Sequence, residues 1–428
     1  MLVTNARLAD GRHRDLRVDG ERIAEIESTL DEHPDETIID ADGKRLLPGM
    51  VDSHVHFREP GFPEKETWAS GSRAAAAGGV TTVVDQPNTD PPTVDGVTFD
   101  EKTTHAADSY VDFGINGGVT PDWDATELFE RPLFALGEVF LADSTGKMGI
   151  EEDLFANAAR KAGEHGVPVT VHAEDADRFD PDARERTDAD AWSAYRTPAA
   201  ERAAIEQATE IGAKTDARLH IAHTSTPEGI DAARDGGMTC EVTPHHLLLS
   251  RADLADLGTF GRMNPPLRSE QRRKGVFERV ADGKVQIVAT DHAPHTREEK
   301  DAGIWDAPSG VPGVETALPL LLEEVRQGRL GFERVRDLTA ANPAEIFDLP
   351  RKGRIEVGRD ADLVLVDPDS PREIRGEDRH SKAGWTPFEG RQGIFPKWTM
   401  VRGTVIYKRT ADGDRFGEAV GENVRSSK

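Results

Sequence analysis

Cysteine, lysine and long apolar runs are scarce in this chain. Cys240 is the only cysteine among 428 residues, which excludes an internal disulfide and a metal site built from several thiolates. No apolar run reaches the roughly 18 residues that a membrane-spanning helix needs. The N-terminus carries charges every few residues and lacks the apolar core of a secretory signal. We therefore expect a cytoplasmic protein that is not inserted in a membrane.

The charge of the chain is strongly one-sided. It has 53 basic and 79 acidic residues, a formal net charge of −26, and 14 of the 53 basic residues are lysines, which leaves 39 arginines. Such a surface repels nucleic acid and anionic membranes, so neither is an expected partner. An acid-rich, lysine-poor composition favours a halophilic protein that works in concentrated salt, where charge repulsion is screened. An ordinary acidic cytoplasmic protein is the alternative.

Both ends of the chain have the pattern of short antiparallel strands. Residues 1–48 alternate apolar and polar positions between Asp-Gly turns, and a similar pattern returns at 355–366 and 398–407. Two strand-rich ends around one long middle predict a small composite β-sandwich domain formed from residues 1–48 and 350–410. The polar tail at 411–428 is expected to be frayed.

The middle of the chain, residues 49–349, alternates short β-branched runs with helical stretches rich in Ala, Glu and Arg. This rhythm predicts an α/β fold, a (β/α)8 TIM barrel, with an open doubly wound sheet as the alternative. We expect strands at 49–56, 80–85, 111–116, 133–141, 167–172, 217–223, 239–243 and 285–291, and helices at 69–78, 151–165, 198–213 and 269–281.

Histidines and one aspartate fall at the ends of the expected strands. His54 and His56 end the first strand, and because alternate residues of a strand share a face, both imidazoles can reach one metal ion. His172, His223 and Asp291 end the fifth, sixth and eighth strands. Any one of these histidines could be an ordinary buried residue. Since the carboxyl ends of barrel strands meet at one face, the set as a whole predicts a metal site.

The expected ligands favour zinc, with manganese or cobalt as lesser options, because they offer nitrogen and carboxylate oxygen but no thiolate. They also exceed the three protein ligands of a simple catalytic zinc. Two ions are therefore expected, and two ions need a bridging carboxylate to hold them against their mutual repulsion. The fourth strand should supply that bridge.

A series of motifs resembles the dihydroorotases of the amidohydrolase superfamily, in family order from Gly49 to Thr316. A further segment, SKAGWTPFEG at 381–390, resembles the C-terminal region of that family. The motifs are GMVDSHVHFREPG at 49–61, DQPNT at 85–89, VHAED at 171–175, IAHTS at 221–225, TCEVTPHHLLLS at 239–250, MNPPLR at 263–268, ATDHAPHT at 289–296 and PSGVPGVET at 308–316.

The resemblance implies an enzyme that reversibly closes N-carbamoyl-L-aspartate to L-dihydroorotate with loss of water, in de novo pyrimidine (UMP) biosynthesis. It implies that His54, His56 and Asp291 bind one metal ion and that His172 and His223 bind the other. Asp291 would also carry the proton between water and the ring nitrogen. The substrate carboxylate would be held by Arg58 and Asn88, joined by Asn264 and His295, and the loop from Pro308 to Gly310 would close over the pyrimidine ring.

The fourth strand departs from the family pattern. Many relatives carry a carboxylated lysine there as the bridge between two metals, whereas the segment ALGEVFLADSTG places Glu138 at that position. Glu138 is our expected bridge and Asp143 its competitor. In a third interpretation Glu138 lies outside the ligand set and the centre holds one metal.

Arg58 separates the functional alternatives. Hydantoinases and allantoinases share the metal centre and the barrel, but their rings carry no carboxylate at that place and they usually lack this arginine. An ion pair of Arg58 with Glu59 or Glu64 on the surface is the alternative for that residue. A non-catalytic partner protein of this fold is a second alternative, since fold does not guarantee activity. We also keep a homodimer as a hypothesis.

Overall fold

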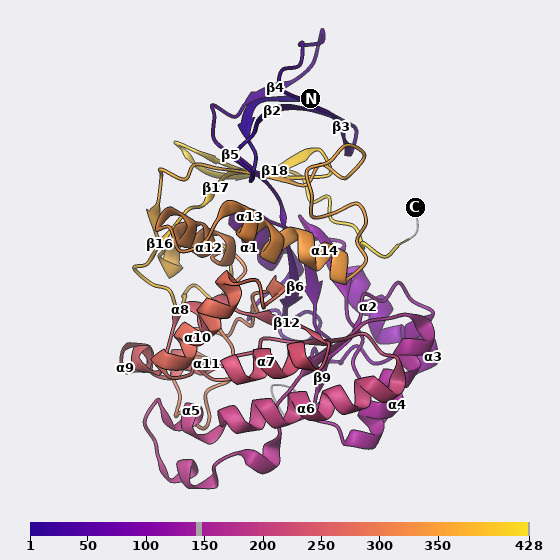
Figure 1. Cartoon of the computed structure of the whole chain (residues 1–428), viewed down its shortest axis with the longest axis vertical. Helices are drawn as coiled ribbons and strands as arrows, with labels where there is room; N and C mark the ends of the chain where they lie inside the picture. Colours follow the sequence, from indigo (N-terminus) through magenta and orange to yellow (C-terminus); the bar gives the residue numbers. More distant parts are fainter. Residues whose placement is uncertain (143–147, 427–428) are drawn as a thin grey trace.

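A barrel of eight parallel strands forms the centre of the molecule in a computed structural model that describes residues 1–142 and 148–426 (Figure 1). All eight expected strands are present, which confirms the TIM-barrel prediction over the open sheet. They are β6 (Met50–Val55), β7 (Val80–Asp85), β8 (Asp112–Ile115), β9 (Leu136–Phe140), β10 (Val169–His172), β11 (Leu219–Ile221), β12 (Thr239–Val242) and β13 (Ile287–Val288).

Two arcs of parallel strands close the barrel. One arc has the order β6-β7-β8 and the other β9-β10-β11-β12-β13. A bridge between Gly117 and Leu136 joins the arcs on one side, and a bridge between Val55 and His292 joins them on the other. At the second seam the backbone N–H of His56 donates to the carbonyl of His292 over 2.8 Å. The second seam lies at the carboxyl ends of β6 and β13, where the sequence predicts the site, whereas the first joins the segment after β8 to the start of β9.

Helices of the barrel follow the strands as expected. The first, α1 (Trp68–Gly78), begins at a capping box in which Thr67 and Ser70 satisfy each other's backbone N–H groups. It ends at Gly79, whose φ of 85° suits a residue without a Cβ. The other helices of eight or more residues are α2 (Gly96–Ala106), α4 (Glu152–His165), α6 (Pro198–Thr215), α7 (Pro227–Asp235), α10 (Glu270–Ala281) and α12 (Ala317–Arg326).

Shorter helices lie in the connections between these elements. Two of them, α5 and α11, belong to the long excursions that follow β10 and β13. The short helices are α3 (Ala125–Phe129), α5 (Ala191–Tyr195), α8 (Pro244–Leu248), α9 (Leu254–Leu257), α11 (Arg297–Lys300), α13 (Phe332–Arg336) and α14 (Asn342–Ile346).

Strands from both termini form one nine-stranded mixed sheet beside the barrel, seen as indigo and yellow strands at the top of Figure 1. Its own apolar cluster includes Val3, Leu16, Leu363 and Trp398. The strands are β1 (Leu2–Arg7), β2 (His13–Asp19), β3 (Arg22–Glu27), β4 (Ile38–Asp40), β5 (Arg45–Pro48), β14 (Leu363–Val366), β17 (Pro396–Val401), β18 (Thr404–Thr410) and β19 (Gly413–Phe416). A separate pair, β15 (Arg372–Glu373) and β16 (Gln392–Gly393), lies between them in the chain.

The C-terminal segment differs from the expectation of a frayed tail, which was wrong for residues 413–426. β19 pairs with β18, and further on the Phe113 N–H donates to the Glu422 carbonyl while the Val424 N–H donates to the Phe113 carbonyl. These bonds extend the edge of β8. The tail is ordered by backbone pairing, which a polar composition does not prevent.

None of the described helices is both long enough and apolar enough to span a membrane.

The net charge of −26 predicts that folding stability depends on salt. The Debye length falls from about 10 Å at 0.1 M salt to about 3 Å at 1 M, so concentrated salt screens most of the repulsion between surface carboxylates. We expect the Tm to rise as KCl is raised from 0.1 M to above 1 M. A protein of similar size and near-zero net charge, melted in the same buffers, controls for general salt effects. Equal Tm values at both salt concentrations would contradict the halophilic interpretation.

Candidate metal centre

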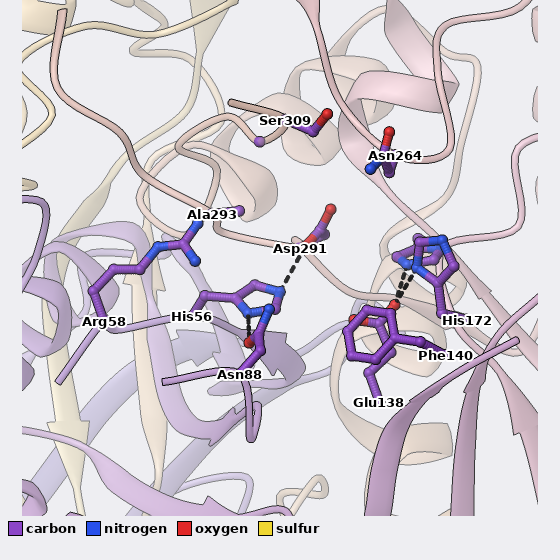
Figure 2. Close-up of a pocket in the computed structure, with 12 residues that line it drawn as sticks. His56, Arg58, Asn88, Glu138, Phe140, His172, Asn264, Asp291, Ala293 and Ser309 are labelled. Carbon is purple, nitrogen blue, oxygen red and sulfur yellow. Dashed lines mark hydrogen bonds and ion pairs between the residues drawn. The ribbon is translucent and has the colours of Figure 1, made fainter. Parts of the chain in front are cut away.

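Six predicted ligand residues converge at the carboxyl end of the barrel. Figure 2 labels His56, Glu138, His172 and Asp291 among them. They come from six different positions of the chain, and each is at most 6% exposed. The barrel therefore gathers them as the sequence predicted. The residues are His54 in β6, His56 just after it, Glu138 in β9, His172 at the end of β10, His223 after β11 and Asp291 after β13.

Glu138 lies in the middle of three imidazoles. Its Oε1 is 2.7 Å from His172 Nδ1 and is also hydrogen-bonded to His223 Nε2. Its Oε2 is 3.4 Å from His54 Nε2. The two carboxylate oxygens thus face histidines from three different strands. The competing residue, Asp143, lies outside the described residues.

Asp291 lies on the other side of His54. Its Oδ1 is 3.1 Å from His56 Nε2 and 3.6 Å from His54 Nε2. Two groups of described residues can therefore hold an ion, each with ligand atoms within 4.8 Å of one another. The first group is His54, His56 and Asp291, and the second is His54, Glu138 and His223. His172 adjoins the second group through Glu138.

These residues fit a divalent cation. His54 Nε2 is buried and has no hydrogen-bond partner among the described residues, although the Glu138 and Asp291 carboxylates lie 3.4 and 3.6 Å away. A buried polar atom without a partner is costly, and a metal ion between the imidazole and the carboxylates would satisfy it. The donors are nitrogen and oxygen only, the set typical of zinc among the common metals of such sites.

The pKa shifts of Glu138 and His172 also support a cation at this centre. Burial alone would raise the pKa of Glu138, but the imidazoles of His223, His54 and His172 lower it well below its usual range. Burial alone would lower the pKa of His172, but the Glu138 carboxylate raises it to about 9. The raised pKa of His172 favours a proton on that imidazole beside Glu138 in the metal-free protein, and a bound cation would displace it.

Three buried side chains outside the predicted metal ligands hold the histidines from behind. The His54 Nδ1–H donates to Glu241 over 2.7 Å, the His56 Nδ1–H donates to Asn88 Oδ1 over 2.7 Å, and the His172 Nε2–H donates to Glu174 over 2.9 Å. Sequence reasoning assigned no role to Glu241 or Glu174. A charged residue between the apolar neighbours Cys240 and Val242 of a buried strand was the available signal for Glu241.

The centre opens into a cavity (Figure 2). Of the twelve residues that line it, nine were predicted from the sequence. The other three are Phe140 and Ala293, which carried no metal or substrate signal, and Ser309, which lies in the loop expected to close over the substrate. The predicted ones are His56, Arg58, Asn88, Glu138, His172, His223, Asn264, Asp291 and Gly310.

Arg58 points from the β6–α1 connection toward this cavity (Figure 2). It is 3% exposed, so it is not a surface residue paired with Glu59 or Glu64. Its Nε donates to the Pro294 carbonyl over 3.2 Å, and its Nη2 lies 3.2 Å from His295 Nε2. Burial lowers the pKa of Arg58 to about 10, so the guanidinium stays charged at neutral pH.

The two other predicted substrate residues differ in their placement. Asn264 lines the cavity, and its Oδ1 accepts a 3.0 Å hydrogen bond from Trp192 Nε1, which fixes the orientation of the amide. His295 does not line the cavity. It is fully buried beside Arg58, with Nε2 3.0 Å from the Ser309 carbonyl, and burial lowers its pKa to about 3. It therefore lies behind Arg58 as a neutral imidazole.

The loop expected to close over the substrate is held in place by the buried side chain of Lys300. Lys300 Nζ donates to the carbonyls of Arg262, Pro308 and Gly310 at 2.9, 2.9 and 3.1 Å. Gly310 has a φ of 136°, and a Cβ there would lie 2.6 Å from the Ala293 carbonyl oxygen. Only glycine fits at this point of the cavity wall.

Comparison with known proteins agrees with this geometry. The model of the amidohydrolase family matches residues 45–406. A dihydroorotase of Halobacterium salinarum is 66% identical over 99% of each chain, and a dihydroorotase of Methanosarcina acetivorans is 44% identical over 92% of this chain and 89% of its own. The chain belongs to the dihydroorotases of the amidohydrolase family. The resemblance predicted from the sequence motifs is confirmed, and with it the assignment as a metal-dependent enzyme of that family.

Similar solved structures confirm the fold. The L-hydantoinase of Arthrobacter aurescens superposes with a TM-score of 0.91 at 28% identity, covering 99% of this chain and 98% of its own. A dihydropyrimidinase of Brevibacillus agri gives 0.90 at 27% identity over 100% and 98%. The barrel with an additional sheet from both termini is thus shared with enzymes that carry different names.

Removal of metal by a chelator should destabilise this family member. A ligand at about 1,000 times its Kd contributes about 4 kcal/mol to the stability of the folded state, and the metal-free centre retains buried charges that only protons balance. We expect the Tm to fall after dialysis against chelator and to recover on addition of zinc. Addition of magnesium, which prefers six oxygen ligands, is the control. A Tm that is the same with and without zinc would contradict a metal at this centre.

Proposed function

We propose that the chain catalyses the reversible closure of N-carbamoyl-L-aspartate to L-dihydroorotate and water. The observation that supports this reaction most directly is the buried Arg58 in a cavity that also contains the candidate metal ligands. A buried guanidinium needs an anionic partner, and a substrate carboxylate supplies one with matching two-pronged geometry. The relatives named dihydroorotase support the same reaction.

The proposed centre holds two zinc ions bridged by Glu138. His54, His56 and Asp291 would hold one ion, and His172 and His223 the other. The position of Glu138 supports the bridge, because one of its oxygens faces His172 and His223 while the other faces His54. Zinc ions bound there would acidify a water molecule and polarise the amide carbonyl of the substrate.

Asp291 is the proposed proton carrier. In the hydrolytic direction water adds to the ring carbonyl carbon, the ring C–N bond breaks, and the nitrogen must gain a proton. Burial raises the pKa of Asp291, but its hydrogen bond to His56 and the neighbouring imidazoles lower it overall, so the carboxylate is ready to accept a proton. Its place in the cavity wall lets it reach both the water and the leaving nitrogen.

Arg58, Asn88 and Asn264 are the proposed contacts of the substrate carboxylate. Only the nitrogen of an amide can donate to an anion, and the Asn88 and Asn264 oxygens lie against His56 and Trp192. His295 would hold Arg58 from behind, and Gly310 would lie over the ring of the substrate.

A hydantoinase-type amide hydrolase is the second candidate. The solved structures with TM-scores of 0.91 and 0.90 favour it, because they are a hydantoinase and a dihydropyrimidinase. Their identities of 28% and 27% are well below the 66% and 44% of the dihydroorotases, and Arg58 fits a carboxylate that hydantoin lacks.

The assay that tests the function measures ring closure of carbamoyl aspartate and opening of dihydroorotate, with hydantoin as the competing substrate. Arg58→Lys keeps the charge but loses the two-pronged donor, so we expect kcat/KM for carbamoyl aspartate to fall about 10- to 100-fold. Arg202→Lys, at an exposed arginine that pairs with Glu206, is the control and should not change the rate. Faster turnover of hydantoin, unaffected by Arg58→Lys, would favour the second candidate.

The identity of the bridge is tested by a matched pair of variants, Glu138→Gln and Asp143→Asn. Each removes one negative charge with little change of size. We expect Glu138→Gln to bind fewer than two zinc ions per chain, whereas Asp143→Asn should keep both. The activity of Glu138→Gln should also fall by more than the about 10- to 100-fold that is typical when a hydrogen-bond partner of a metal ligand is lost. Zinc is counted by mass spectrometry of the purified variants. Loss of zinc in Asp143→Asn alone would make Asp143 the bridge, and one ion in the unmodified chain would support the mononuclear alternative.

A further inference from the structure

Glu241 is a buried carboxylate beneath the candidate metal centre that takes no part in the mechanism proposed above. It belongs to β12, is 2% exposed and does not line the cavity, so it cannot contact the substrate. Its oxygens accept four hydrogen bonds, two each. Oε1 accepts from the His54 side chain at 2.7 Å and the His223 backbone N–H at 3.3 Å, and Oε2 accepts from the Ser53 hydroxyl at 2.8 Å and the His220 ring at 3.2 Å.

The bond to His54 fixes which nitrogen can bind a metal. A neutral imidazole has one N–H and one lone pair, so donation from Nδ1 to Glu241 leaves the lone pair on Nε2. That nitrogen faces Glu138 and Asp291 and has no hydrogen-bond partner among the described residues. His54 is also the one residue that belongs to both candidate groups of ligands. The orientation of the His54 ring therefore affects both candidate metal positions.

The carboxylate behind His172 differs in its charge balance. Glu174 receives two hydrogen bonds from the Arg196 guanidinium, at 3.0 and 2.6 Å, so its charge is compensated. Among the described residues, no lysine or arginine forms an ion pair with Glu241, and the two rings that contact its carboxylate are those of His54 and His220. The other ring nitrogen of His220, Nδ1, lies 2.8 Å from the Thr239 hydroxyl oxygen. Glu241 thus keeps a negative charge directly below the centre.

Glu241 also connects ligands from different strands. Through the His54 side chain and the Ser53 hydroxyl it binds β6, and through the His223 backbone it binds the end of β11. His223 has a φ of 30°, an uncommon value for a residue with a side chain. A hydrogen bond to its N–H helps to hold that conformation.

We propose that Glu241 is a positioning residue that presents His54 Nε2 to the metal and strengthens cation binding through a carboxylate charge that no described lysine or arginine neutralises. This inference rests on the proposed zinc centre. A carboxylate behind a metal-bound histidine makes the imidazole a better ligand, and its loss costs about 10- to 100-fold in metal affinity. Replacement of Glu241 by glutamine turns one of its two acceptor oxygens into an NH2 donor. The groups that donated to that oxygen then lose their acceptor and face another donor.

The test measures zinc affinity of the full-length chain by competition with a chelator of known affinity. We expect Glu241→Gln to raise the zinc Kd about 10- to 100-fold. Glu201→Gln is the matched control, because Glu201 is equally buried and accepts four hydrogen bonds from Ser225 and Thr226 but contacts no metal-ligating side chain. Its zinc Kd should stay within about twofold of the unmodified chain, although both variants lose a buried carboxylate.

The Tm of the metal-free proteins separates positioning from a merely structural role. If Glu241 only supports the fold, Glu241→Gln and Glu201→Gln will lower the metal-free Tm without a selective change in zinc Kd, and the inference fails. If Glu241→Gln does not fold, Glu241→Asp replaces it, since its shorter side chain moves the carboxylate away from His54, and the same rise in Kd is expected. If the unmodified chain binds zinc tightly and Glu241→Gln binds it with the same Kd, only the inference about Glu241 is overturned. Absence of zinc binding by the unmodified chain overturns the zinc centre as well.

Discussion

Closure of the barrel between β13 and β6 is the constraint on which the site depends. The backbone N–H of His56 donates to the His292 carbonyl over 2.8 Å, and this bond joins the first and last strands at their carboxyl ends. His56 and the neighbour of His292, Asp291, are thereby brought together with their side-chain atoms 3.1 Å apart, although 235 residues separate them in the chain. A gap in the barrel at this seam would separate the ligands of the first group while leaving those around Glu138 in place.

Strain in the backbone accompanies this arrangement. Arg58, His223 and Asp291 all have positive φ, at 68°, 30° and 46°, a region that residues with a side chain seldom occupy. Such conformations cost of order 1–3 kcal/mol each and persist only where the surroundings determine them. Here the surroundings are the closed strands and the hydrogen bonds to Glu241 and the Pro294 carbonyl. Three strained residues lining one cavity are typical of a functional site. The rest of the barrel must supply the stability that offsets their strain.

The sequence predicted the ligands because of a property of parallel strands, not because of the ligands themselves. Once eight strands alternate with helices, residues at their carboxyl ends must share a face, so His54, His172 and Asp291 could be placed without a structure. Contacts that depend on side-chain direction across the barrel could not. Nothing in the sequence shows that Glu241, on a strand separated from β6 by β13, reaches the His54 ring, or that Trp192 turns the amide of Asn264. The order of the C-terminal tail was missed for a related reason, since backbone pairing leaves no trace in composition.

The charges around the centre explain how a shorter acid can stand where many relatives have a carboxylated lysine. Glu174 is compensated by Arg196, so the remaining negative charges of the centre are Glu138 and Asp291 among the ligands and Glu241 behind His54, three in all. Two zinc ions would bring four positive charges, and the surplus would attract an anion into the cavity beside Arg58. A dicarboxylate substrate meets that surplus and the guanidinium together. The same balance gives a reason for a negative charge below His54, because a buried pair of dications is stable only where carboxylates nearly match it.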